Sequence, residues 1–174
     1  MKSVLMSIRA NISATIFKSW TKRLEYRTRW NSDFKGRVYV YESGKDGGKV
    51  AGFFDVGRVV KAYRTKDIST DDLLFLDTLD DHNFNEFFSI KETAARPYIY
   101  AIEIKNPHVF KPSITLEEFN SAYKVNVQRA PQSWQYIEVN DMELFDERIL
   151  GVPVELATPP EGETPTEQFM KKER

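Results

Sequence analysis

Two apolar runs joined by a glycine-rich turn constrain the fold of this chain more than any other feature. Residues 37–43 (RVYVYES) alternate strictly, so that their valines share one face of a strand and their tyrosines share the other. The turn SGKDGG follows, and residues 49–60 (KVAGFFDVGRVV) form a second run with the composition of a strand. The pattern therefore predicts a β-hairpin.

Shorter patterns on both sides of this hairpin predict further strands and helices. Apolar spacing, capping residues and turn residues set their expected bounds. Asn11 is the expected N-cap of the first helix, and TLEE at 115–118 predicts a capping box. The expected strands are 1–9, 23–29, 97–105, 123–129 and 134–139, and the expected helices are 11–20, 69–79, 83–91 and a short one that includes Phe119.

The order of these elements predicts an α+β fold with a mainly antiparallel, curled sheet or a small barrel. With 174 residues, the chain is long enough for one domain and too short for two ordinary ones. We expect that domain at residues 1–140 and a C-terminal extension at 141–174. After about residue 157 the extension is rich in Pro, Glu and Thr, which predicts a flexible tail.

The composition narrows the chemistry. The chain has no cysteine, which excludes disulfides, thiol catalysis and cysteine-ligated zinc. Its two histidines, His82 and His108, lie far apart in expected loops, so we expect no metal site and no cofactor, although Asp80 and Asp81 adjoin His82. No apolar run reaches the roughly 18 residues that a membrane span needs, and no signal peptide is recognisable. We therefore expect a cytoplasmic protein without membrane contact.

Charge is distributed unevenly along the chain. Residues 1–49 hold eleven Lys or Arg against four Asp or Glu, whereas residues 138–174 carry an acidic excess. A basic segment suits a polyanion such as RNA, and an ordinary solvated face is the alternative interpretation. The acidic C-terminal part leaves a protein-interaction module as a third interpretation.

The basic turn at residues 44–49 (GKDGGK) is not a nucleotide-binding P-loop. Three residues rather than four separate its bracketing glycines, Val50 follows where a Ser or Thr would bind magnesium, and a strand follows instead of a helix. We interpret the segment as a hairpin turn with a basic tip.

The segment 20–30 (WTKRLEYRTRW) carries more specific information. If residues 23–29 form a strand, Arg23, Glu25, Arg27 and Arg29 share one face. A single Glu among bases indicates either a surface ladder of ion pairs or the lining of a pocket.

Several short segments, taken in order, resemble the ASCH domain, a member of the PUA-like superfamily. They cover about residues 4–139. The matching segments are SIR at 7–9, KRLEYR at 22–27, YES at 41–43, KVAGFF at 49–54, AIEIKN at 101–106 and PQSW at 131–134.

The resemblance implies a small PUA-like β-barrel with short flanking helices around a cleft that binds RNA or a nucleoside. Some relatives are ribonucleases, and others are amidohydrolases acting on acylated cytidines through a Lys-x-x-Thr motif. Here Lys22 is retained but Glu25 occupies the threonine position, and a carboxylate cannot replace a hydroxyl as the acyl acceptor.

We therefore expect an RNA-binding or modified-nucleoside-binding domain, with a metal-independent hydrolase as the alternative. A hydrolase would use Lys22, Tyr41 and Ser133, with Lys22 or Lys49 stabilising the charge that develops on the phosphorus. The predicted partners are RNA or a nucleoside-like small molecule. The residues expected to line the site are Arg9, Lys22, Glu25, Arg27, Tyr41, Ser43, Lys49, Gln132, Ser133 and Trp134.

Overall fold

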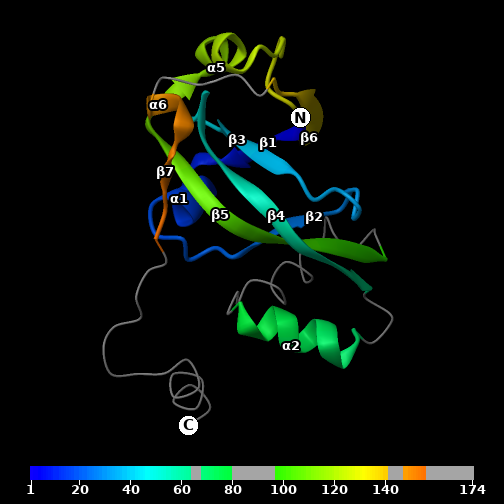
Figure 1. Ribbon diagram of the computed structural model, residues 1–174. Helices are drawn as coiled ribbons and strands as arrows, with labels where there is room; N and C mark the ends of the chain where they lie inside the picture. Colours follow the sequence, from blue (N-terminus) through cyan, green and yellow to red (C-terminus); the bar gives the residue numbers. More distant parts are fainter. Residues whose placement is uncertain (64–67, 80–96, 141–146, 156–174) are drawn as a thin grey trace, which may run out of the picture.

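The computed structural model describes residues 1–63, 68–79, 97–140 and 147–155 of the chain (Figure 1). Within these residues it contains a seven-stranded sheet. The strands are β1 (Lys2–Arg9), β2 (Leu24–Arg27), β3 (Arg37–Ser43), β4 (Lys49–Tyr63), β5 (Tyr98–Thr115), β6 (Trp134–Glu138) and β7 (Val152–Pro153). The helices are α1 (Ala10–Phe17), α2 (Thr70–Thr78), α5 (Leu116–Tyr123) and α6 (Glu147–Leu150).

The sheet is curled but not closed. Its strand order is β2-β5-β4-β3-β1-β6, with β7 pairing to β5 beside this path. β2 and β6 are the two ends of the path, so the closed barrel that we predicted is not confirmed. The predicted α+β class and the curled sheet are confirmed, although β1 and β3 pair in parallel rather than antiparallel.

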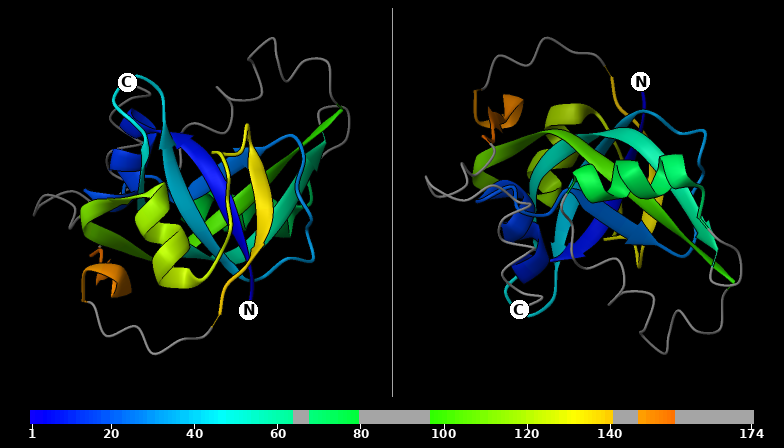
Figure 2. Two further views of the ribbon diagram at one scale, coloured as in Figure 1. Left: turned by 90° about the horizontal axis from the view of Figure 1, so that it is seen from above. Right: turned by 90° about the horizontal axis from the view of Figure 1, so that it is seen from below.

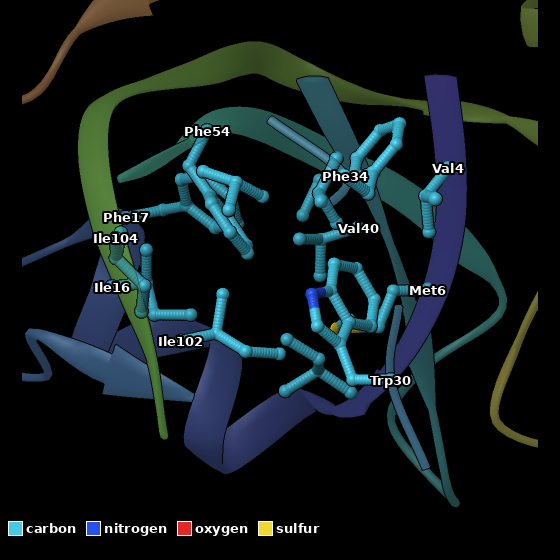
Figure 3. Packing of buried hydrophobic residues seen from close by; sticks show 14 residues of the cluster. Val4, Met6, Ile16, Phe17, Trp30, Phe34, Val40, Phe54, Ile102 and Ile104 are labelled. Carbon is cyan, nitrogen blue, oxygen red and sulfur yellow. The ribbon is translucent and has the colours of Figure 1, made fainter. Parts of the chain in front are cut away.

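The inner face of the curl holds the largest apolar cluster. It contains alternate residues of β1 and β3, such as Met6 and Val40, together with Ile16 of α1, Phe54 of β4 and Ile102 of β5. Figure 3 shows these side chains pointing toward one another from around the curl. Burial of this face against itself and α1 is the driving force that curls the sheet.

Two further clusters cover the outer face. At one end, α5 packs its Phe119 and Tyr123 against Leu5, Tyr39 and Phe110. At the other end, α2 packs Leu76 against Leu24, Val60, Ala62 and Ile99 of β2, β4 and β5. Figure 2 shows α2 lying across these strands in its right-hand view.

Most predicted elements are confirmed, with three corrections. The first helix starts at Ala10, and its N-cap is Arg9 without a side-chain hydrogen bond, so Asn11 is not the cap. Residues 124–129 are not a strand, because α5 extends to Tyr123 and ends at Lys124 in the left-handed conformation. β4 and β5 also continue beyond the predicted strand ends.

The predicted capping box is confirmed, and a second helix also has a side-chain cap. The Ser69 hydroxyl accepts a hydrogen bond from Asp72 N, and Thr115 and Glu118 form the reciprocal capping box. The predicted helix at 83–91, the acidic pair beside His82 and the predicted tail lie outside the described residues.

The C-terminal extension contributes to the sheet within its described part. Val152 and Pro153 pair with Val109 and His108 of β5, and Tyr123 Oη donates a 2.6 Å hydrogen bond to Ile149 O. In the described part of the chain, no helix is long and apolar enough to cross a membrane.

Candidate functional site around Glu25

Glu25 lies on the inner face of the sheet. On β2 it pairs with Ile102, a member of the inner cluster, whereas its neighbours Leu24 and Tyr26 face the cluster under α2. The alternation of a strand thus places a carboxylate where an apolar side chain would be expected. Of our two interpretations of this strand face, the exposed ion-pair ladder is wrong for Glu25.

Two cations hold this carboxylate. Lys22 Nζ lies 3.4 Å from Glu25 Oε2, and the Arg27 guanidinium approaches Glu25 Oε1 at 2.9 Å and 3.0 Å through Nη2 and Nε. The three side chains are only 11%, 9% and 15% exposed, in sequence order. A buried carboxylate with two cationic partners is electrostatically compensated, and the formal charges of the three side chains sum to +1.

Arg27 also connects the two open edges of the sheet. From β2 its Nη1 donates to Ser133 Oγ at 3.1 Å, and its Nη2 donates to the backbone oxygen of Ser7 on β1 at 2.9 Å. Ser7 N in turn donates to Ser133 O at 2.9 Å. We call Lys22, Glu25, Arg27 and Ser133 the Glu25 cluster.

Aromatic side chains adjoin this closure. Trp134 pairs with Met6 and packs half-buried against the inner cluster. Its Nε1 donates to Arg29 O at 2.9 Å, and its ring lies 5.1 Å from that of Trp30. Trp134 therefore lies on the same inner face as Glu25, in contact with Arg29 and Trp30 of the segment after β2.

The remaining predicted site residues are not members of the Glu25 cluster. Tyr41 shares the α5-covered outer face with Tyr39, so the structure does not bring it to the inner-face carboxylate. Arg9 and Ser43 are register neighbours at the C-terminal ends of β1 and β3, two residues beyond Ser7 along β1, and Lys49 begins β4 beside the same turn. Gln132 is exposed next to Ser133.

Two polar residues of this region were missed by the sequence analysis. Ser7 contributes a backbone oxygen, for which no side-chain signal exists. Glu42 accepts a 2.9 Å hydrogen bond from the fully buried Ser13 of α1, and its position two residues after Val40 already indicated the inner face.

No group of three metal-ligating side chains occurs among the described residues. His108, the one histidine they include, stacks on Phe53 with ring centroids 4.7 Å apart. The Glu25 cluster itself offers one carboxylate already neutralised by two cations, which is a poor cation site and a good site for a polar, partly anionic ligand.

Comparison with known proteins identifies the fold. No family model matches the sequence, and no curated protein matches it. Three crystal structures of the ASCH protein from Zymomonas mobilis are similar to this structure.

The similarity extends over most of both chains. The ASCH structure without a named mutation has a TM-score of 0.52 at 17% identity and covers 78% of this chain and 87% of its own. A tyrosine-to-phenylalanine mutant has a TM-score of 0.53 at 15% identity and covers 79% of this chain and 91% of its own. A serine-to-alanine mutant has a TM-score of 0.53 at 15% identity and covers 78% of this chain and 88% of its own. The chain thus has the ASCH fold, as its sequence resemblance predicted.

Proposed function

We propose that this protein binds RNA or a modified nucleoside, and that the Glu25 cluster holds the base. The observation that supports this most is a nearly buried carboxylate fixed between two cations, with a half-buried tryptophan on the same face. A carboxylate in this position accepts a hydrogen bond from the exocyclic amine of a base, as carboxylates do from cytosine. Lys22 and Trp134 supply charge and a stacking surface.

The basic amino-terminal third provides the second part of the proposal. Arg9 and Lys49 are both exposed and lie at one end of β1, β3 and β4. We assign to them contacts with phosphates, which raise affinity without reading sequence.

Substitution of Glu25 separates these two roles. Glu25→Gln should weaken a base-specific ligand much more than mixed-sequence RNA, because only the base contact changes. Lys49→Ala should weaken both ligands about equally, by a few-fold. Equal effects of Glu25→Gln on both ligands would contradict a base-reading role for this carboxylate.

RNA hydrolysis is the second candidate, and the exposed Ser133 hydroxyl beside the Arg27 guanidinium favours it. Ser133 is exposed, and its Oγ accepts a hydrogen bond from Arg27. Ser7 of β1 is hydrogen-bonded to Ser133, and β1 pairs with β3, the strand that carries Tyr41. Ser7 is opposite Tyr41 in the β1–β3 register and donates its N–H to Ser133 O. Tyr41 and Ser133 therefore flank β1 at the same level.

A hydrolase would use Ser133 to position or donate a proton and Lys22 or Lys49 to stabilise developing charge. Purified protein should then degrade RNA, and Ser133→Ala and Lys22→Ala should each reduce the rate at least tenfold, whereas Tyr41→Phe, on the outer face, should not. Equal rates in all three variants would point to a contaminating nuclease. The amidohydrolase alternative gains no support, because the acyl-accepting hydroxyl is replaced by Glu25.

A further inference from the structure

The inner face of the sheet continues beyond the Glu25 cluster onto the ends of β4 and β5. Arg27 is opposite Tyr100, and Tyr100 is opposite Lys61, so the three residues form one row across β2, β5 and β4. The neighbouring row joins Glu25, Ile102 and Val59. Successive residues on one strand face are about 7 Å apart, so the Tyr100 row directly adjoins the Glu25 row.

This row is aromatic and basic. Tyr98 and Tyr100 are half-buried, and their rings meet edge to face at a centroid distance of 5.6 Å. The Lys61 ammonium lies 4.0 Å from the centroid of Tyr98 and 5.6 Å from that of Tyr100, and Lys61 is exposed. We call Lys61, Tyr98 and Tyr100 the tyrosine platform.

The opposite face of the same strands is already used by the fold. Val60, Ala62, Ile99 and Ala101 alternate with the platform residues and pack under α2. Arg58 anchors that helix through Asp71 and Asp72, at 2.8 Å and 2.6 Å. The ends of β4 and β5 project past the other strands in Figure 1, with α2 on one side of them. Core formation under α2 thus explains the apolar residues of this ribbon, whereas Tyr100 packs on the other face against the inner cluster.

We propose that the tyrosine platform stacks a base of single-stranded RNA next to the nucleotide held by the Glu25 cluster. The inference rests on the proposed function and extends it to a second subsite. Tyrosine rings offer sequence-tolerant stacking, and Lys61 offers a cation for the intervening phosphate. Lys61 is better placed for that phosphate than Arg27, because Nε, Nη1 and Nη2 of Arg27 each already donate to Glu25, Ser133 or Ser7.

The geometry selects a single strand over a duplex. In a duplex the faces of each base are covered by its neighbours, so stacking on a tyrosine requires that the base first leave the helix. The recessed position of Glu25 imposes the same requirement on the adjacent base. A single-stranded ligand meets both requirements without unpairing.

Fluorescence anisotropy with two labelled probes tests the platform. The probes are a mixed-sequence 12-nucleotide single-stranded RNA and a duplex of the same length. The double variant Tyr98→Leu/Tyr100→Leu should bind the single strand roughly tenfold more weakly or worse, because leucine cannot stack on a base. Its affinity for the duplex should change less than twofold. Lys61→Gln should weaken the single strand by a few-fold.

Matched variants control for folding and for general charge. Phe75→Leu removes a half-buried ring from α2 on the opposite face, and Lys105→Gln removes an exposed cation of β5; both should bind as wild type. Tyr100→Phe keeps the ring, so its loss of affinity for the single strand should be much smaller than that of the leucine double variant. Since Tyr100 packs against the inner cluster, its variants are first compared by thermal unfolding.

The results distinguish the platform from the Glu25 site. Wild-type affinity for the single strand in the leucine double variant, or an equal loss with both probes, would overturn the platform. If Glu25→Gln leaves every ligand unchanged while the leucine double variant loses the single strand, the platform stands and the base-reading role of Glu25 fails. If Glu25→Gln weakens the base-specific ligand while the leucine double variant binds the single strand as wild type does, the Glu25 site is supported and the platform is contradicted.

Discussion

Arg27 Nη1 and Ser133 Oγ are 3.1 Å apart, although 106 positions separate the two residues in the chain. This hydrogen bond spans the gap between β2 and β6, the two ends of the sheet path. Together with the hydrogen bond from Arg27 to Ser7 O, it links two parts of the described sheet between which there is no backbone pairing. The same guanidinium neutralises Glu25, so the closure and the candidate site depend on one residue.

Replacement of Arg27 should therefore be costly. Arg27→Met leaves the buried Glu25 with Lys22 as its cation, and removing one partner of a buried ion pair costs about 3–5 kcal/mol, of which Lys22 offsets a part. Urea unfolding should show a clearly lower midpoint. Arg29→Met, at an exposed neighbour, is the control and should unfold near the wild-type midpoint. Equal midpoints for the two variants would show that the closure does not stabilise the fold.

A double-mutant cycle separates the ion pair from the bridge to Ser133. If most of the loss comes from an uncompensated Glu25, adding Glu25→Gln to Arg27→Met should restore part of the stability, with a coupling energy on the order of 0.5–3 kcal/mol. Additive losses would assign the cost to the bonds with Ser7 and Ser133 instead.

Gly52 should tolerate no side chain. A Cβ at this position would lie 2.1 Å from His108 O and 2.9 Å from Phe17 Cε1, where β4 bulges against β5. Gly52→Ala should destabilise the protein by at least about 1–3 kcal/mol, because backbone rather than a flexible side chain must move. Gly44→Ala, with no atom within 4 Å of the added Cβ, should cost less and reflect only its positive φ. Equal losses would contradict the steric explanation.

Alkaline pH should destabilise the fold through Tyr123. Burial, with a smaller effect of Tyr39, raises the pKa of Tyr123 well above its ordinary value of 10.0. A raised pKa favours the protonated folded form, so this stability is fully present below about pH 10 and is lost as the pH rises above it. The unfolding midpoint should fall steeply above pH 10, and less steeply in Tyr123→Phe. Tyr136→Phe, at an exposed tyrosine, should keep the wild-type slope.

Three features were predictable because each depends on residues close in sequence: the hairpin, the alternation of β3 and the capping box at Thr115. The strand expected at 123–129 was not formed, despite its β-branched Val125 and Val127. Asn120 of α5 explains this, since its side-chain amide bonds both Val127 N, at 3.0 Å, and Val127 O, at 2.9 Å. A polar side chain thus occupies the backbone groups that a strand would have paired.

Prediction of the site met a similar limit. The period of two correctly grouped Glu25 with Arg27 and separated Tyr39 and Tyr41 from the valines of β3. The period of two does not tell which face of β3 lies on the same side of the sheet as the Glu25 face of β2, so Tyr41 was expected beside Glu25. The bond between Arg27 and Ser133 depends on the curl of the whole sheet, which no local pattern encodes.

The composition after residue 157 predicts that the end of the chain does not stabilise the domain. Deletion of residues 158–174 should leave the melting temperature within about 2 °C, less than a change of 1 kcal/mol produces in a chain of this size. Deletion of residues 147–174 is the contrasting control. It also removes β7 and the acceptor of the Tyr123 hydroxyl, and should lower the melting temperature by several degrees. A large drop in the shorter deletion would show that residues 158–174 pack on the domain.

Salt dependence tests whether phosphates contribute to binding. Each Lys or Arg that contacts a phosphate releases a counterion, so affinity for mixed-sequence RNA should fall roughly tenfold or more between about 50 and 200 mM salt if several phosphates are bound. Lys49→Ala should reduce the slope of log affinity against log salt by about one, whereas Lys105→Ala should leave it unchanged. Tight binding with a flat salt response would instead favour a recessed nucleoside ligand, read by Glu25 and Trp134 with little help from the basic residues at the hairpin. The affinity of Glu25→Gln should also be measured at both salt concentrations. Because a base contact does not depend on counterion release, the fold-loss relative to wild type should be the same at each.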